Sequence, residues 1–339
     1  MDYINYIKDQ LLALTSIPSP SSYTHKIVKY VADELKSMGY EAYEDKKHNL
    51  LACLGGEGSP LLITAHIDTL GCMVRAVKPN GRLRLTAIGG FQWGTADGEN
   101  CHIHTRDGRT YTGVIMNTNP SCHVTDTRKL VRTDENLEVL IDENVSTKEE
   151  VLALGIQPGD IVSVDPKTVF TPSGYIKSRY LDNKMSSAIL MGFAKMISDE
   201  KIVLPRKVTI MFTSTEEIGT GACHIPDDTE ELLCVDMGCV GEDLSCTERQ
   251  VSICAKDSGG PYDYDMVTKL IELAKKNHID YAVDVYPFYG SDAEATIRAG
   301  YEVHYSLIGA GIYASHNYER SHVDGMKNTY ELLKAFVFD

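Results

Sequence analysis

The sequence lacks several features that define large classes of proteins. It has no surplus of basic residues, because 33 lysines and arginines face 48 aspartates and glutamates and the formal net charge is −15. A protein whose main partner is nucleic acid needs a basic face for the phosphates, so this class is excluded. The sequence also has no apolar run of about 18 residues, the length that spans a membrane. Neither nucleic acid nor a membrane is therefore expected as a partner.

Paired cysteines are absent as well. The nine cysteines are scattered without a CxxC pair, and several, such as Cys53 and Cys234, lie inside apolar runs. This pattern is typical of buried free thiols in a reducing compartment. The N-terminal segment MDYINYIKDQLLALTS has no basic region followed by an apolar region, so it does not read as a signal peptide. We therefore expect a cytoplasmic location.

The composition that remains is that of an ordinary globular protein. Of the 339 residues, 43% are hydrophobic and 24% are charged, with 27 glycines and 12 prolines. Disordered, collagen-like and coiled-coil proteins are excluded by this balance. At about 150 residues per domain, the length suggests two domains.

Helices alternate with strands at both ends of the chain. Apolar spacing predicts helices over 3–14 and 27–38, and short strands follow around 41–44, 50–54 and 61–65. The alternation returns after residue 177, which is typical of a layered α/β domain. The later elements are a helix over 184–197, strands over 208–213 and 232–235, a helix over 265–277, strands over 281–286 and 302–308, and a final helix over 327–336.

Between residues 73 and 169 short β-like runs dominate, separated by turn signals such as Pro158-Gly159. The one helix expected there begins with a capping box of Thr147 and Glu150. This pattern predicts a small β-barrel or sandwich. We therefore predict a three-layer α/β domain, residues 1–72 and 170–339, interrupted by an inserted β domain, residues 73–169.

Polar residues with possible chemistry follow several of these strands. His66 and Asp68 follow the strand LLIT; imidazole binds zinc-like metals, and its second nitrogen usually donates to a carboxylate or carbonyl. On its own this pattern is more typical of a histidine in a surface loop. Asp182 lies where a helix begins, and there it could simply be an N-cap.

Glu216 and Glu217 follow the strand VTIMFT. Adjacent carboxylates repel each other unless a cation lies nearby, so one could bind a metal while the other acts as general base. The alternative is a solvated acidic loop. Asp236 ends an apolar strand, where its charge must be paired, bound to a metal or placed at the edge of the sheet.

A late loop, YASHNYERSH, carries His316 and His322. Together the motifs supply two histidines, three carboxylates and a spare glutamate, which suits two metal ions about 3.5–4 Å apart. His102 and His104 alternate within one predicted strand and are not expected to bind a metal.

The order HID, YLDNK, STEEIG, VDMG and SHxYERxH resembles the deblocking or glutamyl aminopeptidase family of di-metal exopeptidases, of the tetrahedral-aminopeptidase type. The resemblance covers essentially the whole chain, including the β insertion. It implies a zinc-exopeptidase-like α/β core with an inserted small β-barrel. It assigns His66 and Asp236 to one metal, Glu217 and His316 to the other, Asp182 to a bridge between them, Glu216 to the general base, and Asp68 to the orientation of His66.

The resemblance leaves the last ligand open between His316 and His322, because many relatives place that histidine before a Ser-Pro pair and here Asn317 follows. Two divalent ions per subunit are implied, zinc by default and cobalt or manganese as alternatives. A homo-oligomer is also implied, often of twelve subunits, with the β domain building the contacts between subunits. The motif GSDAEA, with Asp292 and Glu294, either lies near the substrate pocket or caps the next helix.

These features predict a metalloprotease, an aminopeptidase that hydrolyses N-terminal residues from peptides with free amino termini through a metal-activated water. The alternatives are a related hydrolase, such as an N-acyl amino acid deacylase or a carboxypeptidase, or a glucanase, which needs only a carboxylate pair. A non-catalytic binding paralogue is a further alternative, which predicts eroded ligands. The preferred N-terminal side chain is not indicated.

Overall fold

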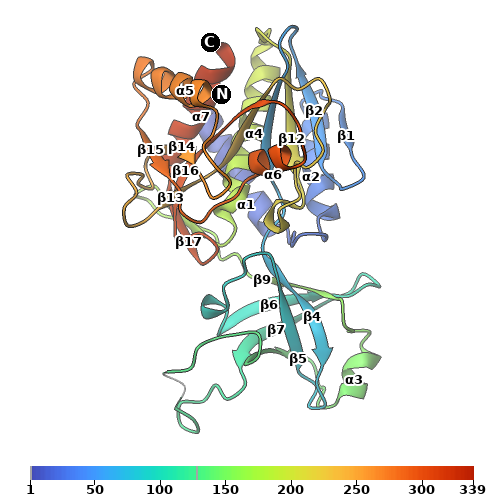
Figure 1. Cartoon of the computed structure of the whole chain (residues 1–339). Coiled ribbons are helices and arrows are strands. Elements are labelled where there is room, and N and C mark those ends of the chain that lie inside the picture. Colours follow the sequence, from blue (N-terminus) through green and yellow to red (C-terminus); the bar gives the residue numbers. More distant parts are fainter. Residues whose placement is uncertain (1, 127–128) are drawn as a thin grey trace. The chain divides into compact units, whose positions relative to one another are not determined.

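The computed structural model describes residues 2–126 and 129–339 (Figure 1). The chain divides into two compact units, one of residues 1–68 with 167–339 and one of residues 69–166. Within the described residues, no helix is both long and apolar enough to cross a membrane. The predicted fold class, an α/β protein with an inserted β-barrel, is confirmed by this architecture.

The larger unit is built on an 11-stranded mixed sheet with the order β1-β2-β12-β3-β13-β16-β17-β11-β10, while β14 and β15 extend from β16. Neighbouring strands β12, β3, β13 and β16 run parallel, so their carboxyl ends meet at one edge. The strands are β1 (Ala42–Glu44), β2 (Leu50–Gly55), β3 (Leu61–His66), β10 (Val169–Phe170), β11 (Tyr175–Ser178), β12 (Val208–Thr213), β13 (Glu231–Val240), β14 (Val251–Lys256), β15 (Tyr281–Val285), β16 (His304–Tyr313) and β17 (Glu319–His322).

Six α-helices complete this unit: α1 (Tyr3–Ser16), α2 (His25–Ser37), α4 (Leu181–Glu200), α5 (Tyr264–Lys276), α6 (Asp292–Arg298) and α7 (Val323–Phe338). The predicted helices are present, but α7 begins four residues before its expected start. The reason is a cap, since the His322 side chain accepts a hydrogen bond from the backbone N–H of Asp324.

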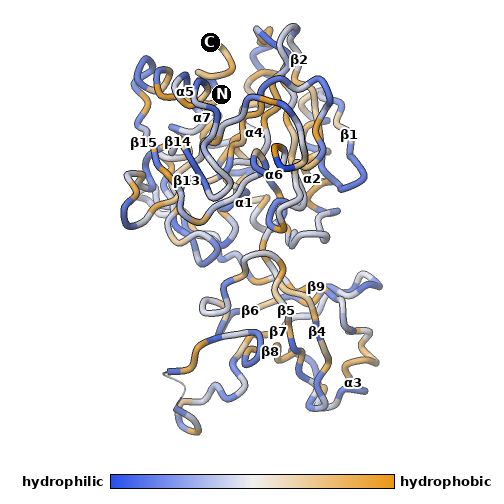
Figure 2. The backbone as a smooth tube through the Cα atoms, viewed as in Figure 1, coloured by the Kyte–Doolittle hydropathy of each residue, from blue (hydrophilic) through white to orange (hydrophobic). Residues whose placement is uncertain are grey.

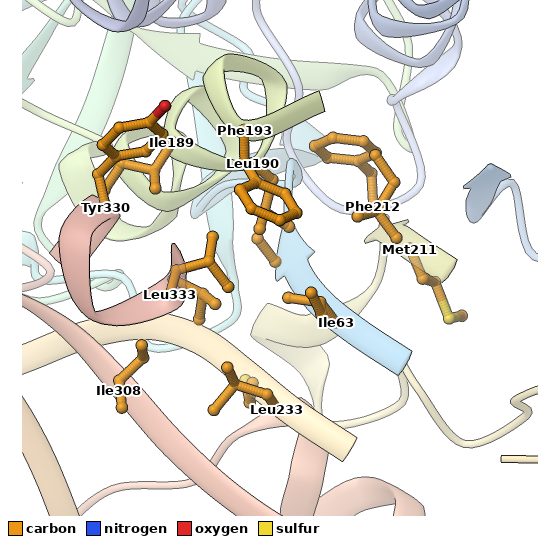
Figure 3. Packing of buried hydrophobic residues seen from close by; sticks show 14 of the residues in the cluster. Ile63, Ile189, Leu190, Phe193, Met211, Phe212, Leu233, Ile308, Tyr330 and Leu333 are labelled. Atoms are coloured by element: carbon orange, nitrogen blue, oxygen red, sulfur yellow. The ribbon is translucent and has the colours of Figure 1, made fainter. Parts of the chain in front are cut away.

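Helix α4 lies at the centre of the larger unit and is buried along most of its length. It contacts α1 and α7 as well as strands β3 and β13, which explains why its apolar residues are not confined to one stripe. Figure 3 shows Leu190 and Phe193 of α4 close to Ile63 of β3 and Phe212 of β12, all fully buried. This packing fixes the N-terminal turn of α4, which carries Asp182, against the edge where the parallel strands end.

The smaller unit is a closed barrel with the strand order β4-β5-β8-β7-β6-β9. Buried and less buried residues alternate along strands such as β5 and β7, as a barrel with a packed interior requires, and the hydropathy along the backbone is shown in Figure 2. Its elements are β4 (Gly71–Val77), β5 (Leu83–Ile88), β6 (Glu99–His104), β7 (Thr110–Asn117), β8 (Leu137–Ile141), α3 (Lys148–Ala153) and β9 (Ile161–Val164). The predicted capping box of Thr147 and Glu150 is present at α3.

A buried lysine ties α4 to α1. Lys184 is 1% exposed, and its Nζ donates to the carbonyl oxygens of Leu14 (2.9 Å) and Ile17 (2.7 Å). These carbonyls lie at the C-terminal end of α1, where unpaired acceptors and the helix dipole favour a cation. Lys184 therefore anchors the end of α1 to the turn that carries Asp182.

This lysine should make stability depend on pH. Burial lowers the pKa of Lys184 to about 7, against the opposing charge of Asp68. Between pH 7 and the ordinary lysine pKa of 10.5 the unfolded chain binds more protons than the folded chain, so this group's contribution to the free energy of unfolding rises with pH. In denaturant titrations, we expect the free energy of unfolding of wild type to rise by about 2 kcal/mol relative to that of Lys184→Met between pH 7 and pH 9.

The control for this prediction is Lys29→Met, which removes a lysine from the exposed face of α2. Its stability difference from wild type should show no comparable trend. A difference for Lys184→Met that stays constant from pH 7 to pH 9 would contradict the prediction.

Candidate metal centre

The sequence-predicted ligands come from separate elements that meet at the carboxyl edge of the parallel strands. β3 ends with His66, β13 carries Asp236, and the short 3-10 helix Glu216–Ile218 after β12 carries Glu217. The first turn of α4 and the loop after β16 supply the other two. Those residues are His66, Asp182, Glu217, Asp236 and His316.

Three of these residues form a first group that could hold one metal ion. His66 Nε2 lies 3.1 Å from Asp182 Oδ1 and 3.9 Å from Asp236 Oδ1. One ligand atom from each of the three lies within 4.8 Å of the others. All three side chains are buried, so a charge placed among them is shielded from water.

A second group lies beside the first. His316 Nε2 is 3.4 Å from Asp182 Oδ2 and 3.7 Å from Glu217 Oε2, and ligand atoms of these three residues also lie within 4.8 Å of one another. Asp182 belongs to both groups and faces them with different oxygens, Oδ1 toward His66 and Oδ2 toward His316. A carboxylate placed in this way is suited to bridge two ions.

The raised pKa values of two carboxylates show that negative charge is concentrated in the centre. Burial raises the pKa of Glu217 to about 8, and the charge of Asp182 adds to this effect. Burial likewise raises the pKa of Asp236 to about 7, against the charge of His66. Such groups remain ionised together only when positive charge lies among them, which divalent cations supply.

The pKa values of the two histidines are also raised, because the surrounding carboxylates outweigh the effect of burial. Burial alone would lower the pKa of His316, but its contacts with Asp182 and Glu217 raise that pKa to about 10. Burial also raises the pKa of Asp182, yet hydrogen bonds from His316 and His66 bring it below the ordinary value. Two imidazoles and three carboxylates form a mixed nitrogen and oxygen donor set that fits zinc, cobalt or manganese.

Glu216 lies beside the first group. Within residues 2–126 and 129–339 it belongs to neither group of candidate ligands, and its Oε2 is 3.6 Å from His66 Nε2. Burial raises its pKa well above the ordinary value, and the charges of Asp236 and Asp292 reinforce this shift. A carboxylate with raised proton affinity next to a metal group is chemically suited to accept and return a proton.

Asp68 contacts both His66 and the backbone of the adjacent glutamates Glu216 and Glu217. The distance from His66 Nδ1 is 3.0 Å to the backbone oxygen of Asp68 and 3.6 Å to its Oδ1, so the carbonyl is the closer partner. Its carboxylate accepts hydrogen bonds from the backbone N–H groups of Glu216 (3.1 Å) and Glu217 (3.3 Å) and from the Ser21 hydroxyl (2.6 Å). Asp68 therefore positions the glutamate pair as well as the histidine.

His322 has hydrogen-bond partners outside these groups. Its Nε2 lies 2.9 Å from the backbone oxygen of Ser173, and its Nδ1 accepts from the Asp324 N–H at the start of α7. Among the candidate ligand groups found in the described residues, His316 is present and His322 is not. Geometry therefore favours His316 of the two histidines in this loop.

The other histidine pair and the GSDAEA motif have structural partners. His102 Nε2 lies 2.9 Å from Asp165 Oδ1, and His104 Nε2 lies 2.9 Å from Ser163 Oγ, within the barrel. Asp292 is buried and accepts hydrogen bonds from Ala222 N–H and the Thr213 hydroxyl, which supports the loop after Glu217.

One buried carboxylate beside the centre is missing from the sequence prediction. Glu319 is 2% exposed and accepts hydrogen bonds from the backbone N–H groups of His316 and Asp182. The only signal in the sequence is an acidic residue three positions after His316, in a loop already rich in polar residues. That signal does not distinguish Glu319 from a solvated surface glutamate.

The chain is similar to a known protein family and to a curated relative. A family model described as M42 glutamyl aminopeptidase matches residues 48–332. The putative aminopeptidase YhfE of Bacillus subtilis (strain 168) is 43% identical over 328 residues, 96% of this chain and 95% of that protein.

Two solved structures extend the similarity to the fold. A structure of PhTET1-12s, described as a dodecamer, is similar over 100% of both chains with a TM-score of 0.86 and 25% identity. The TET1 peptidase of Pyrococcus horikoshii, described as able to assemble into a tetrahedron or a large octahedral shell, covers 98% of this chain and 99% of its own with a TM-score of 0.85 and 24% identity. The similarity therefore includes both compact units.

Proposed function

The chain belongs to the M42 glutamyl aminopeptidase family, a family of metallo-hydrolases, and from this premise we propose that it releases N-terminal residues from peptides with free amino termini. The observation that carries the proposal is the pair of ligand groups that share Asp182, the first buried and the second partly exposed. His66 and Asp236 would hold one ion, Glu217 and His316 the other, and Asp182 both. When bound, two divalent ions would polarise a peptide carbonyl and lower the pKa of water.

The chain's own residues supply the proton transfers in this proposal. Glu216 would take a proton from the attacking water and return it to the leaving amine. Its backbone N–H is held by Asp68, whose carbonyl oxygen also faces His66, so the base and the first metal group share one positioning residue.

Two further expectations accompany this proposal. Zinc is the expected ion, with cobalt or manganese as alternatives for a site rich in carboxylates. We propose a homo-oligomer, and twelve subunits is the expected number because the similar PhTET1-12s is a dodecamer. A cytoplasmic location stays a prediction.

The proposal is tested with peptides that carry either a free or an acetylated amino terminus, each with an amidated carboxyl terminus to block carboxypeptidase cleavage. The protein is assayed after chelation and again after addition of zinc, cobalt or manganese. We expect chelation to abolish release of single residues and one or more metals to restore it, only from free amino termini. Mass spectrometry of the products identifies the residue released.

The remaining outcomes separate the alternatives. Cleavage of the acetylated peptides alone would indicate a deacylase. Cleavage only when the carboxyl terminus is left free would indicate a carboxypeptidase. No cleavage with any metal would favour the non-catalytic paralogue.

A further inference from the structure

Glu319 is a buried carboxylate beside the metal centre to which the proposed reaction gives no role. It is the first residue of β17 and pairs in register with Ser178 of β11. Within the described part of the chain it belongs to neither ligand group. Burying a carboxylate costs free energy unless its oxygens accept hydrogen bonds, so the hydrogen-bond partners of Glu319 indicate its role.

Those partners are the backbones of two candidate ligands. Glu319 Oε1 accepts a hydrogen bond from His316 N–H at 3.0 Å, and Oε2 accepts one from Asp182 N–H at 3.2 Å. The two donors belong to chain segments that are far apart in the sequence. One carboxylate therefore fixes the relative position of two backbones whose side chains meet in the second ligand group.

His316 has a backbone conformation that is costly without support, and Asp182 departs from the helical geometry of α4. His316 has φ 64°, in the left-handed region that residues other than glycine seldom adopt. Asp182, although inside the bounds of α4, has non-helical angles of φ −75° and ψ 103°. Its N–H finds its acceptor in Glu319, and a buried N–H without an acceptor would be costly.

We propose that Glu319 is a positioning residue that holds the His316 and Asp182 backbones in register, and thereby sets the affinity of the second metal position, formed by Asp182, Glu217 and His316. The inference rests on the proposed metal centre. It predicts a larger effect on the second position, because Glu319 contacts the backbones of two of its three ligands, Asp182 and His316, whereas the first position shares only Asp182.

The test uses Glu319→Gln in the full chain. Glutamine has nearly the same size, but its amide offers one acceptor oxygen and one NH₂ donor, so one of the two backbone N–H groups would face another donor. Partners that orient metal ligands typically change metal affinity by about 10- to 100-fold when they are replaced. We expect the second ion to bind at least about tenfold more weakly, while the affinity for the first ion, which shares only Asp182, falls by a smaller factor.

Metal content after dialysis and stepwise titration against a chromophoric chelator measure this effect. Wild type should retain two ions per subunit and Glu319→Gln one. Excess metal should restore activity to Glu319→Gln, because Glu216 is untouched, whereas a general folding defect would not respond to metal. The matched control is Glu248→Gln, which removes a charge paired with the neighbouring Arg320 and should retain two ions.

If Glu319→Gln does not fold, Glu319→Asp decides the question, because aspartate keeps both acceptor oxygens on a shorter side chain. Selective weakening of the second ion in that variant supports the inference. Unchanged binding of both ions, or equal loss of both, overturns it. Should wild type itself bind no ion, the proposed metal centre fails rather than the role of Glu319 within it.

Discussion

Glu216→Gln is expected to reduce kcat by about 100- to 10,000-fold, the range by which general acid–base groups contribute, while two ions per subunit remain bound. Glu216 lies beside the first ligand group but belongs to neither group, so its replacement should affect proton transfer and leave metal binding intact. Glutamine preserves the size of the side chain and leaves the backbone N–H to Asp68 in place. Steady-state hydrolysis of a peptide with a free amino terminus, together with metal analysis of the same sample, measures both quantities.

The adjacent glutamate provides the matched control. Glu217 is a candidate ligand of the second group, 3.7 Å from His316 Nε2, so Glu217→Gln should lose metal as well as activity. The two neighbouring substitutions change the charge equally, and only their positions differ. A near-normal rate for Glu216→Gln would show that another group acts as the base.

Asp182→Ala is expected to remove both ions and to abolish activity. This side chain supplies one oxygen to each ligand group, so its loss leaves each group with two ligands and removes the bridge between them. Metal analysis after dialysis should find close to zero ions per subunit, and added zinc, cobalt or manganese should not restore hydrolysis.

Asp236→Ala is the control for this prediction, because Asp236 belongs to the first group alone. It should lose one ion and retain the other. If Asp182→Ala still held one ion with undiminished affinity, the bridging role would be wrong and the two groups would bind independently.

The local sequence pattern predicted the kind of site, a group of metal ligands at the carboxyl edge of the parallel strands. Each candidate ligand except His316 follows or lies in an apolar strand, or begins a helix, and the carboxyl ends of parallel strands meet at one edge for any sequence that folds in this way. The alternation of helices and strands, with a separate run of short strands between them, likewise predicts the α/β unit and the inserted barrel. These signals are local, because they depend on the period and the order of residues in one segment.

Only the tertiary structure distinguished His316 from His322, since both lie in one polar loop. His322 caps α7 and also contacts Ser173, a partner from a distant segment that the loop's own sequence does not specify. Glu319 is a similar case: the acceptor role of its two oxygens exists only because α4 and the loop after β16 pack beside β17. Local sequence pattern therefore predicted which residues could bind metals, whereas the long-range packing decided which backbones are held together and which carboxylate holds them.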